Sequence, residues 1–142
     1  MRYCNIADPP VYTEEIEHWD RETDADGEAM GVVIEQLVNN DHYHKMNIER
    51  QDHVTLITLV ADAWTGDEAP YEQTVAVEGV TAEDNPMLVS ALEDGVDLAT
   101  QKSYSKAFGI ISSGTGTTTD GSVTFKVYKK PATDITVGLK GV

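Results

Sequence analysis

The sequence contains a single cysteine, Cys4, and no long apolar run. One thiol cannot form an internal disulfide, and it cannot supply the thiolates of a structural zinc site. A membrane-spanning helix needs about 20 consecutive apolar residues, and a signal peptide needs an apolar segment that "MRYCNIADPP" does not have. We therefore expect a chain without membrane insertion and without a cleaved export signal.

Basic residues are also scarce, because 10 lysines and arginines stand against 25 acids, for a formal net charge of −15. Residues 1–52 carry −9 and residues 53–142 carry −6, so the acids are spread along the chain. Nucleic-acid binding relies on clustered Lys and Arg, and a uniformly acidic surface repels phosphate backbones. The composition argues against a nucleic-acid partner and favours solubility at high local concentration.

Sequence patterns typical of active sites are missing as well. GxSxG, GK[ST] and HExxH do not occur, and the glycines of "SGTGTTTDG" lack the third glycine of GxGxxG. Cys4, Ser112 and Ser113 have no histidine partner in a recognisable pattern. We expect no catalytic residue, no cofactor and no enzyme activity.

Two stretches imitate metal sites. The segment "ETDADGEAM" begins like an EF-hand loop, but position twelve, which must supply a bidentate carboxylate, falls on Val33. His42 and His44 could share a metal only in an extended chain, because helical ligands are normally three or four residues apart. We interpret these acids as a helix start and these histidines as its solvated end, so no metal is expected.

The first half has the apolar spacing of an amphipathic helix, and we predict one from about Asp26 to about His44, closed by "NNDH". Pro9 and Pro10 keep the preceding segment extended. One stripe of this helix is apolar: Met30, Val33, Ile34, Leu37 and Val38.

From residue 53 the apolar period changes from 3.6 to 2. Four segments are predicted strands: "HVTLITLVA", "YEQTVAVE", "SVTFKVYKK" and "DITVGLKG". The segment "DLATQKSYSKAFG" is a predicted short helix capped by Gly109, and "SSGTGTTTDGS" is a predicted turn cluster whose Asp120-Gly121 pair suits a hairpin.

These segments predict an α+β fold with two domains. Residues 1–52 form an extended amino-terminal arm and an amphipathic helix, for attachment and oligomerisation. Residues 53–142 form a small, mostly antiparallel domain like a β-sandwich, with one short inserted helix. Only "MNIERQDH" links the helix to this domain, so we expect the apolar stripe to be buried between chains, in a homotrimer.

Two sets of aromatic and apolar residues have candidate roles. Tyr12, Ile16 and Trp19 lie on an arm too short to bury them, and we expect them to pack against another subunit or another protein. Trp64 and Tyr71 flank the acidic turn "TGDEAP" and are candidates for contact with a glycan, although an aromatic at a strand end more often caps a core. For Trp64 we predict a buried anchor of the β domain.

The second half resembles a small carboxy-terminal β domain of structural proteins from tailed bacteriophages and prophages, chiefly those of Gram-positive hosts. The resemblance lies in the order of Trp64, "APYEQTVAVEGVTAEDNPML", "ATQKSYSKAFG" and "GSVTFKVYKKPATDITVGLKGV". It covers about residues 54–142, and "VYTEEI" with a helix ending "LVNND" is similar to the companion segment of such proteins. Related appendage proteins often carry a long shaft between helix and β domain, which this chain lacks.

The resemblance implies a viral protein of the virion, made in the cytoplasm of the bacterial host. It would be a short fibre or capsid decoration subunit, or a subunit of tail or baseplate, with itself and other virion proteins as partners. In such proteins the amino-terminal part attaches to the virion. The alternative is a carbohydrate-binding module that recognises a host-surface glycan through Trp64 and Tyr71.

Overall fold

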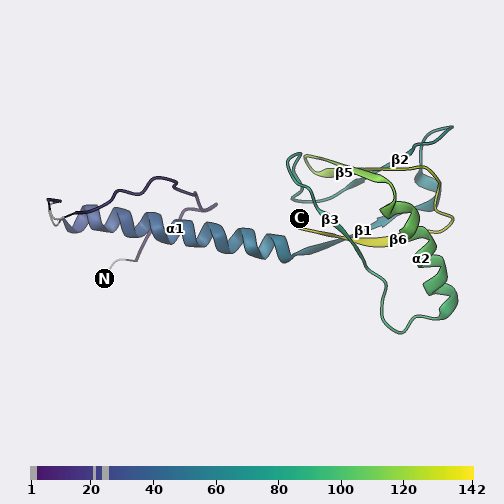
Figure 1. Ribbon diagram of the computed structural model, residues 1–142, viewed down its shortest axis with the longest axis horizontal. Coiled ribbons are helices and arrows are strands. Elements are labelled where there is room, and N and C mark those ends of the chain that lie inside the picture. Colours follow the sequence, from purple (N-terminus) through teal and green to yellow (C-terminus); the bar gives the residue numbers. More distant parts are fainter. Residues whose placement is uncertain (1–2, 21, 24–25) are drawn as a thin grey trace. The chain divides into compact units, whose positions relative to one another are not determined.

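The computed structural model of the chain describes residues 3–20, 22–23 and 26–142. The chain forms two compact units, residues 1–50 and residues 51–142. The elements follow one another as α1, β1, the 3-10 turn η1, β2, β3, α2, β4, β5 and β6 (Figure 1). The fold class is α+β, as predicted from the change of apolar period.

Helix α1 spans Gly27–Asp52 and is the only helix that the structure describes in the first unit. It begins where the sequence predicts. The Asp26 carboxylate caps the first turn by accepting a hydrogen bond from the Glu28 N–H at 2.9 Å. Its predicted end at about His44 was wrong by two turns, and only His53 separates it from the first strand. The predicted eight-residue linker is therefore mostly helix.

The error has a physical cause in the asparagines of "NNDH". Asparagine disfavours a helix interior when its side chain competes for nearby backbone groups. Here the side-chain oxygens of Asn39 and Asn40 accept hydrogen bonds from backbone N–H groups of the arm, although the Asn39 amide also donates to the Glu35 carbonyl of its own helix at 2.8 Å. The helix continues, and Lys45 and Glu49 form an ion pair of 3.9 Å one turn apart.

The second unit contains two antiparallel sheets of three strands each. One sheet has the order β1-β6-β3, with bounds Val54–Leu59, Ile135–Lys140 and Met87–Ser90. The other has the order β2-β5-β4, with bounds Tyr71–Ala76, Ser122–Val127 and Thr115–Thr119. The last strand, β6, is therefore central to the first sheet, and β5 is central to the second.

All four predicted strands are present, but the prediction missed two. Strand β4 lies in the segment interpreted as a turn cluster, and it forms the first arm of the hairpin that turns at Asp120 and Gly121. Gly121 has a φ of 78°, a backbone conformation that few other residues adopt easily. Strand β3 is the apolar run after the proline turn, and only four residues of it pair with β6.

The buried side chains of both sheets form one hydrophobic cluster. Its fully buried members come from β1, from the segment after β2, and from β5 and β6: Leu59, Val77, Val127 and Val137. Trp64 is 4% exposed and belongs to the same cluster, which confirms its prediction as a buried anchor. Gly138 in β6 has no room for a side chain, since a Cβ would lie 2.6 Å from Val89 and 2.7 Å from Val54.

A buried glutamine connects the two sheets. Gln73 of β2 is 5% exposed, and its side-chain amide both accepts from the Val60 N–H at 3.1 Å and donates to the Val60 carbonyl at 2.8 Å. Val60 directly follows β1 and has no strand partner of its own, so the glutamine takes the place of a backbone neighbour. Both polar groups are thereby satisfied inside the core.

Helix α2 spans Leu98–Ser112 and packs on the core through Ala107 and Ile111. The Asp97 carboxylate caps its first turn, and hydrogen bonds from the Thr100 hydroxyl and backbone N–H lower the pKa of that carboxyl group. Gly109 was predicted to end the helix, which instead continues for three residues because Ile111 extends its apolar stripe into the core.

Substitution of the buried tryptophan tests this core. Trp64→Ala is expected to reduce the free energy of unfolding by about 3–5 kcal/mol, because it removes a large buried side chain and leaves a cavity. Chemical denaturation followed by far-UV circular dichroism measures the loss. Tyr128→Ala is the control, since Tyr128 is 73% exposed, and equal stability losses for the two variants would contradict the role assigned to Trp64.

Candidate functional site

The amino-terminal arm runs alongside α1 (Figure 1) and is held there by two neighbouring asparagines. Asn39 donates from its amide nitrogen to the Asn5 carbonyl at 3.1 Å and accepts from the Ala7 N–H at 2.9 Å. The Asn39 side chain thus forms hydrogen bonds with a backbone carbonyl and a backbone N–H of the arm, as a neighbouring strand would.

Asn40 holds a later part of the arm in the same way. It accepts from the Thr13 N–H at 2.7 Å and donates to the Thr13 carbonyl at 2.9 Å. Successive helical residues point about 100° apart, so the two asparagines hold the arm on two different flanks of α1. The arm therefore covers part of the helix circumference and leaves the rest open.

The aromatic side chain of Tyr12 packs against α1 of the same chain. Its ring centroid lies 5.5 Å from that of Tyr43 and 5.3 Å from that of His44. Ile16 and Trp19 are half-buried, and the indole Nε1 of Trp19 is buried without a hydrogen-bond partner. Packing of Tyr12, Ile16 and Trp19 against another protein stays a prediction, and Tyr12 already has a partner within its own chain.

One face of α1 carries apolar side chains that the chain leaves open. No residue of this 26-residue helix is buried, and seven of its large apolar residues are exposed, of which Met30, Ile34, Leu37 and Ile48 lie on one face. We call the following six exposed positions the seam: Met30, Ile34, Leu37, Asp41, His44 and Ile48. Their spacing alternates between four and three residues, which is the a/d spacing of a coiled coil.

The seam only partly matches the stripe predicted from the sequence. Met30, Ile34 and Leu37 belong to both, whereas Val33 and Val38 are half-buried on its two flanks. The prediction missed the second half of the seam because "NNDH" was interpreted as the helix end. Continuing the four-three spacing through that segment to Ile48 would have found it.

The flanks of the seam carry little charge for so acidic a chain. In a coiled coil these flanks are the e and g positions, which face a partner helix. Here they hold Gly31, Val33, Val38, Asn40, Lys45, Asn47 and Asp52. Asp52 is the single acid among them, and its carboxylate lies 3.1 Å from the Lys140 ammonium. In a coiled coil of several copies of α1, charges of the same sign would therefore face each other at few of these flanking positions.

The proposed glycan platform of Trp64 and Tyr71 does not offer two open rings. Trp64 is 4% exposed, and Tyr71 is half-buried with the Lys130 ammonium 4.6 Å from its ring centroid. A sugar stacks on an exposed ring face. These two residues therefore serve the core and a cation contact in this structure.

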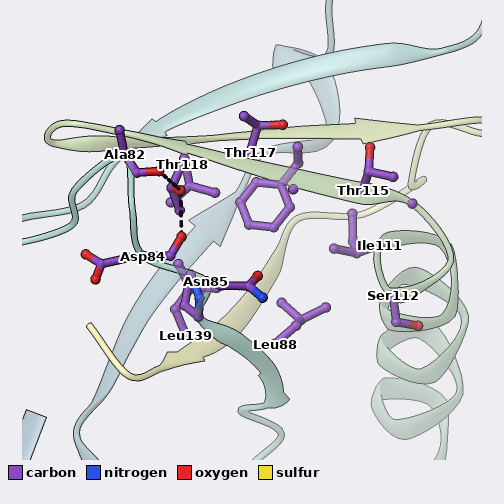
Figure 2. Close-up of a pocket in the computed structure, with 15 residues that line it drawn as sticks. Ala82, Asp84, Asn85, Leu88, Ile111, Ser112, Thr115, Thr117, Thr118 and Leu139 are labelled. Carbon is purple, nitrogen blue, oxygen red and sulfur yellow. Dashed lines mark hydrogen bonds between the residues drawn. The ribbon is translucent and has the colours of Figure 1, made fainter. Parts of the chain in front are cut away.

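A pocket of about 370 Å³ lies between the edge strands β3 and β4 (Figure 2). Leu88, Ile111 and Leu139 are among its apolar lining residues, and β4 contributes threonines. The Thr118 hydroxyl donates to the Asp84 carbonyl at 2.7 Å, and the Asp84 carboxylate accepts from the Thr81 N–H at 2.7 Å. These polar groups hold the loop before β3, and they do not form a pair of nucleophile and base.

The stretches that resemble metal sites have structural partners. Asp26 caps α1, His44 packs against Tyr12, and the residues at positions 24 and 25 of the EF-hand-like segment lie outside the described part of the chain. Across residues 3–20, 22–23 and 26–142 there is no group of three His, Cys, Asp or Glu side chains placed to hold a metal ion. In the same ranges, no helix is both long and apolar enough to cross a membrane.

Comparison with known proteins gives no relative. The chain matches no protein-family model, no curated protein sequence and no solved structure.

The asparagine contacts predict which substitution frees the arm. Asn40→Ala is expected to expose the Thr13 amide to rapid hydrogen exchange, because it removes the acceptor 2.7 Å away. Asn47→Ala is the matched control, since the Asn47 side chain donates only to the Tyr43 carbonyl of its own helix, at 3.1 Å. Both variants gain the same helix propensity. Unchanged exchange at Thr13 in Asn40→Ala would contradict the role assigned to Asn40 in holding the arm.

Proposed function

We propose that this chain is a non-enzymatic structural subunit of a tailed-bacteriophage particle and that it assembles with copies of itself into a trimer. The seam of α1 carries the self-association, and the unit of residues 51–142 is a sandwich-like domain displayed by the assembly. The particle would be the location of the protein, and other virion proteins of tail, baseplate or capsid would be its further partners.

The observation that carries this proposal is the uncovered apolar face of α1. Met30, Ile34 and Leu37 are 46%, 48% and 53% exposed, and Ile48 is 62% exposed. A helix of this length gains most of its stability by packing an apolar face. A second copy supplies the same a/d spacing, so each apolar layer of one helix meets an apolar layer of the next.

The width of the apolar face favours three helices over two. Val33 and Val38 flank Ile34 and Leu37, and at about 100° per residue the four span an arc of about 140°. Such an arc is wider than the narrow a/d stripe that one partner helix covers. In a three-helix bundle each helix contacts two neighbours, which covers the valines as well.

Polar residues in the middle of the seam favour one register. Asp41 and His44 occupy an a and a d position between the apolar layers, and His44 also contacts Tyr12 of its own arm. A polar residue in a coiled-coil core lowers stability and at the same time disfavours any alignment that places it against an apolar layer. The polar layers therefore disfavour shifted registers, and alignment of the Asp41 carboxylates of three chains lowers the stability of the trimer at the same time.

The assignment to a bacteriophage particle rests on the sequence resemblance of residues 54–142. A displayed domain of this kind needs a stable core and a soluble surface rather than a reactive centre. The acidic net charge of −15 suits that role, because it prevents non-specific association of many copies held close together. The same charge opposes trimer formation, so salt screening favours assembly.

Substitutions on the helix test the seam. Ile34→Asp and Leu37→Asp are each expected to dissociate the trimer, because they place a charge in an apolar layer. Val32→Asp is the matched control, since Val32 is 52% exposed, as open as Ile34, but lies outside the seam. Light scattering at moderate salt is expected to give a mass near three times 15.5 kDa for the parent and the control.

Two results would contradict this assignment. A parent protein with a mass of 15.5 kDa at micromolar concentration and at every salt concentration is a monomer. Equal dissociation by Val32→Asp and Ile34→Asp would show that added charge, rather than the seam, controls the mass.

The location in a particle has its own test. Antibodies against residues 51–142 are expected to label one site on purified particles in negative-stain images. A chain without residues 1–20 is expected to keep its second unit folded and to be missing from particles, because the arm carries Tyr12, Ile16 and Trp19. Particles that incorporate the shortened chain normally would refute the role of the arm, and unlabelled particles would refute the location.

A further inference from the structure

Lysines gather at one place in a chain that has few of them. Residues 53–142 contain six basic residues, all lysines, and four of these line a single pocket. The pocket has a volume of about 330 Å³, and α2 lies on one side of it, with the segment between β5 and β6 on the other. The lysines are Lys102, Lys106, Lys129 and Lys130. We call this site the lysine pocket.

Helix geometry explains how α2 presents its part of the pocket. Lys102 and Lys106 are four residues apart and therefore lie on one face, with Ser103 beside them. Ala107 and Ile110 form an apolar floor on the same side. Opposite, Thr133 places its hydroxyl oxygen 3.3 Å from that of Ser103, so two hydroxyl groups meet in the pocket.

None of the four ammonium groups has a carboxylate partner among the residues that the structure describes. Elsewhere in this unit the lysines are paired, because Lys126 lies 2.7 Å from Glu72 and Lys140 lies 3.1 Å from Asp52. Within the described part of the chain, no acid lies within ion-pair distance of Lys102, Lys106 or Lys129. Lys130 donates to the Trp64 carbonyl at 3.2 Å, which fixes its position without neutralising it.

The nearest acids in sequence are directed elsewhere. Asp134 accepts a hydrogen bond from the Ala61 N–H at 2.8 Å, and Asp97 accepts from the first turn of α2. The lining of the lysine pocket contains no acid, whereas the pocket between β3 and β4 includes Asp84. A positive potential therefore remains inside this pocket, although the whole chain is strongly negative.

We propose that the lysine pocket binds a small ligand that carries a phosphate group. Ammonium groups attract phosphate as point charges, and hydroxyl groups donate hydrogen bonds to its oxygens. The volume, at the lower end for ligand pockets, suits one phosphorylated sugar or polyol unit, whose carbon skeleton can rest on Ala107 and Ile110. The site is independent of the seam of α1.

Nucleic acid is the less suitable source of such a phosphate. Binding along a nucleic-acid backbone needs a row of basic residues, and this site is a single pocket on an acidic surface. The unit could come from a free phosphorylated metabolite or from the repeating unit of a phosphate-containing polymer. The chemistry recognised is the same in both cases.

Amide chemical shifts of the full chain test the proposal. Glycerol 1-phosphate is expected to shift the backbone amides near Lys102, Lys106 and Lys129, whereas glycerol at the same ionic strength is expected to shift none of them. A glycerol phosphate polymer that shifts the same amides at lower phosphate concentration identifies the polymer as the source. Shifts by the monomer at equal or lower concentration identify the free metabolite.

A charge-matched pair of variants separates a local site from a general effect of charge. Lys102→Gln with Lys106→Gln is expected to weaken glycerol 1-phosphate binding by about tenfold or more. Lys126→Gln with Lys140→Gln changes the net charge equally and is expected to leave the affinity within about twofold, and its loss of two exposed ion pairs costs little stability. Circular dichroism confirms that both variants are folded.

Several outcomes would overturn the proposal. Equal weakening by the two double variants would mean that only net charge matters. Equal shifts by glycerol and by glycerol 1-phosphate would mean that phosphate is not recognised. Tighter binding of a single-stranded oligonucleotide or of polyglutamate than of the phosphate compounds would identify a nucleic acid or an acidic protein as the ligand instead.

Discussion

The structure of the first unit depends on one constraint, which is that a long helix has too few partners within its own chain. Helix α1 has 26 residues, and none of them is buried. The arm covers part of the helix surface, and it is held there mainly by hydrogen bonds and by the aromatic contacts of Tyr12. Folding of this region therefore leaves the apolar residues of the seam about half exposed. This shortage of internal contacts is the basis of the self-association that we propose.

Side-chain amides repeatedly replace a missing backbone partner in this chain. Asn39 and Asn40 do so for the arm, and Gln73 does so for Val60 inside the core. Each amide offers one donor and one acceptor in nearly the arrangement of a peptide group, so an extended segment can be satisfied without a neighbouring strand. This device lets the arm lie against a helix, and it lets β1 end beside β2 without leaving buried polar groups unpaired.

The fold gathers positive charge in one pocket, although acids outnumber bases throughout the sequence. The acids are spread over the whole chain, and the composition alone argued against a nucleic-acid partner. The fold nevertheless brings Lys102 and Lys106 on α2 together with Lys129 and Lys130, which follow β5. Net charge governs long-range repulsion, whereas binding at a pocket depends on the charges within a few ångströms. An acidic chain can therefore hold a basic pocket.

The sequence by itself determined the class of each half, the start of α1, four of the six strands and the burial of Trp64, because these depend on local periodicity and on single strong preferences. It misplaced the ends of both helices and missed β3 and β4. Asn39, Asn40 and Gly109 are residues that often end a helix. Helix α1 nevertheless continues past the two asparagines, which contact the arm, and α2 continues past Gly109 because Ile111 packs in the core. The threonine-rich β4 is a strand because β5 pairs with it. The exposure of the seam and the formation of the lysine pocket were decided only by the tertiary structure, since each depends on which distant segments cover a surface and which leave it open.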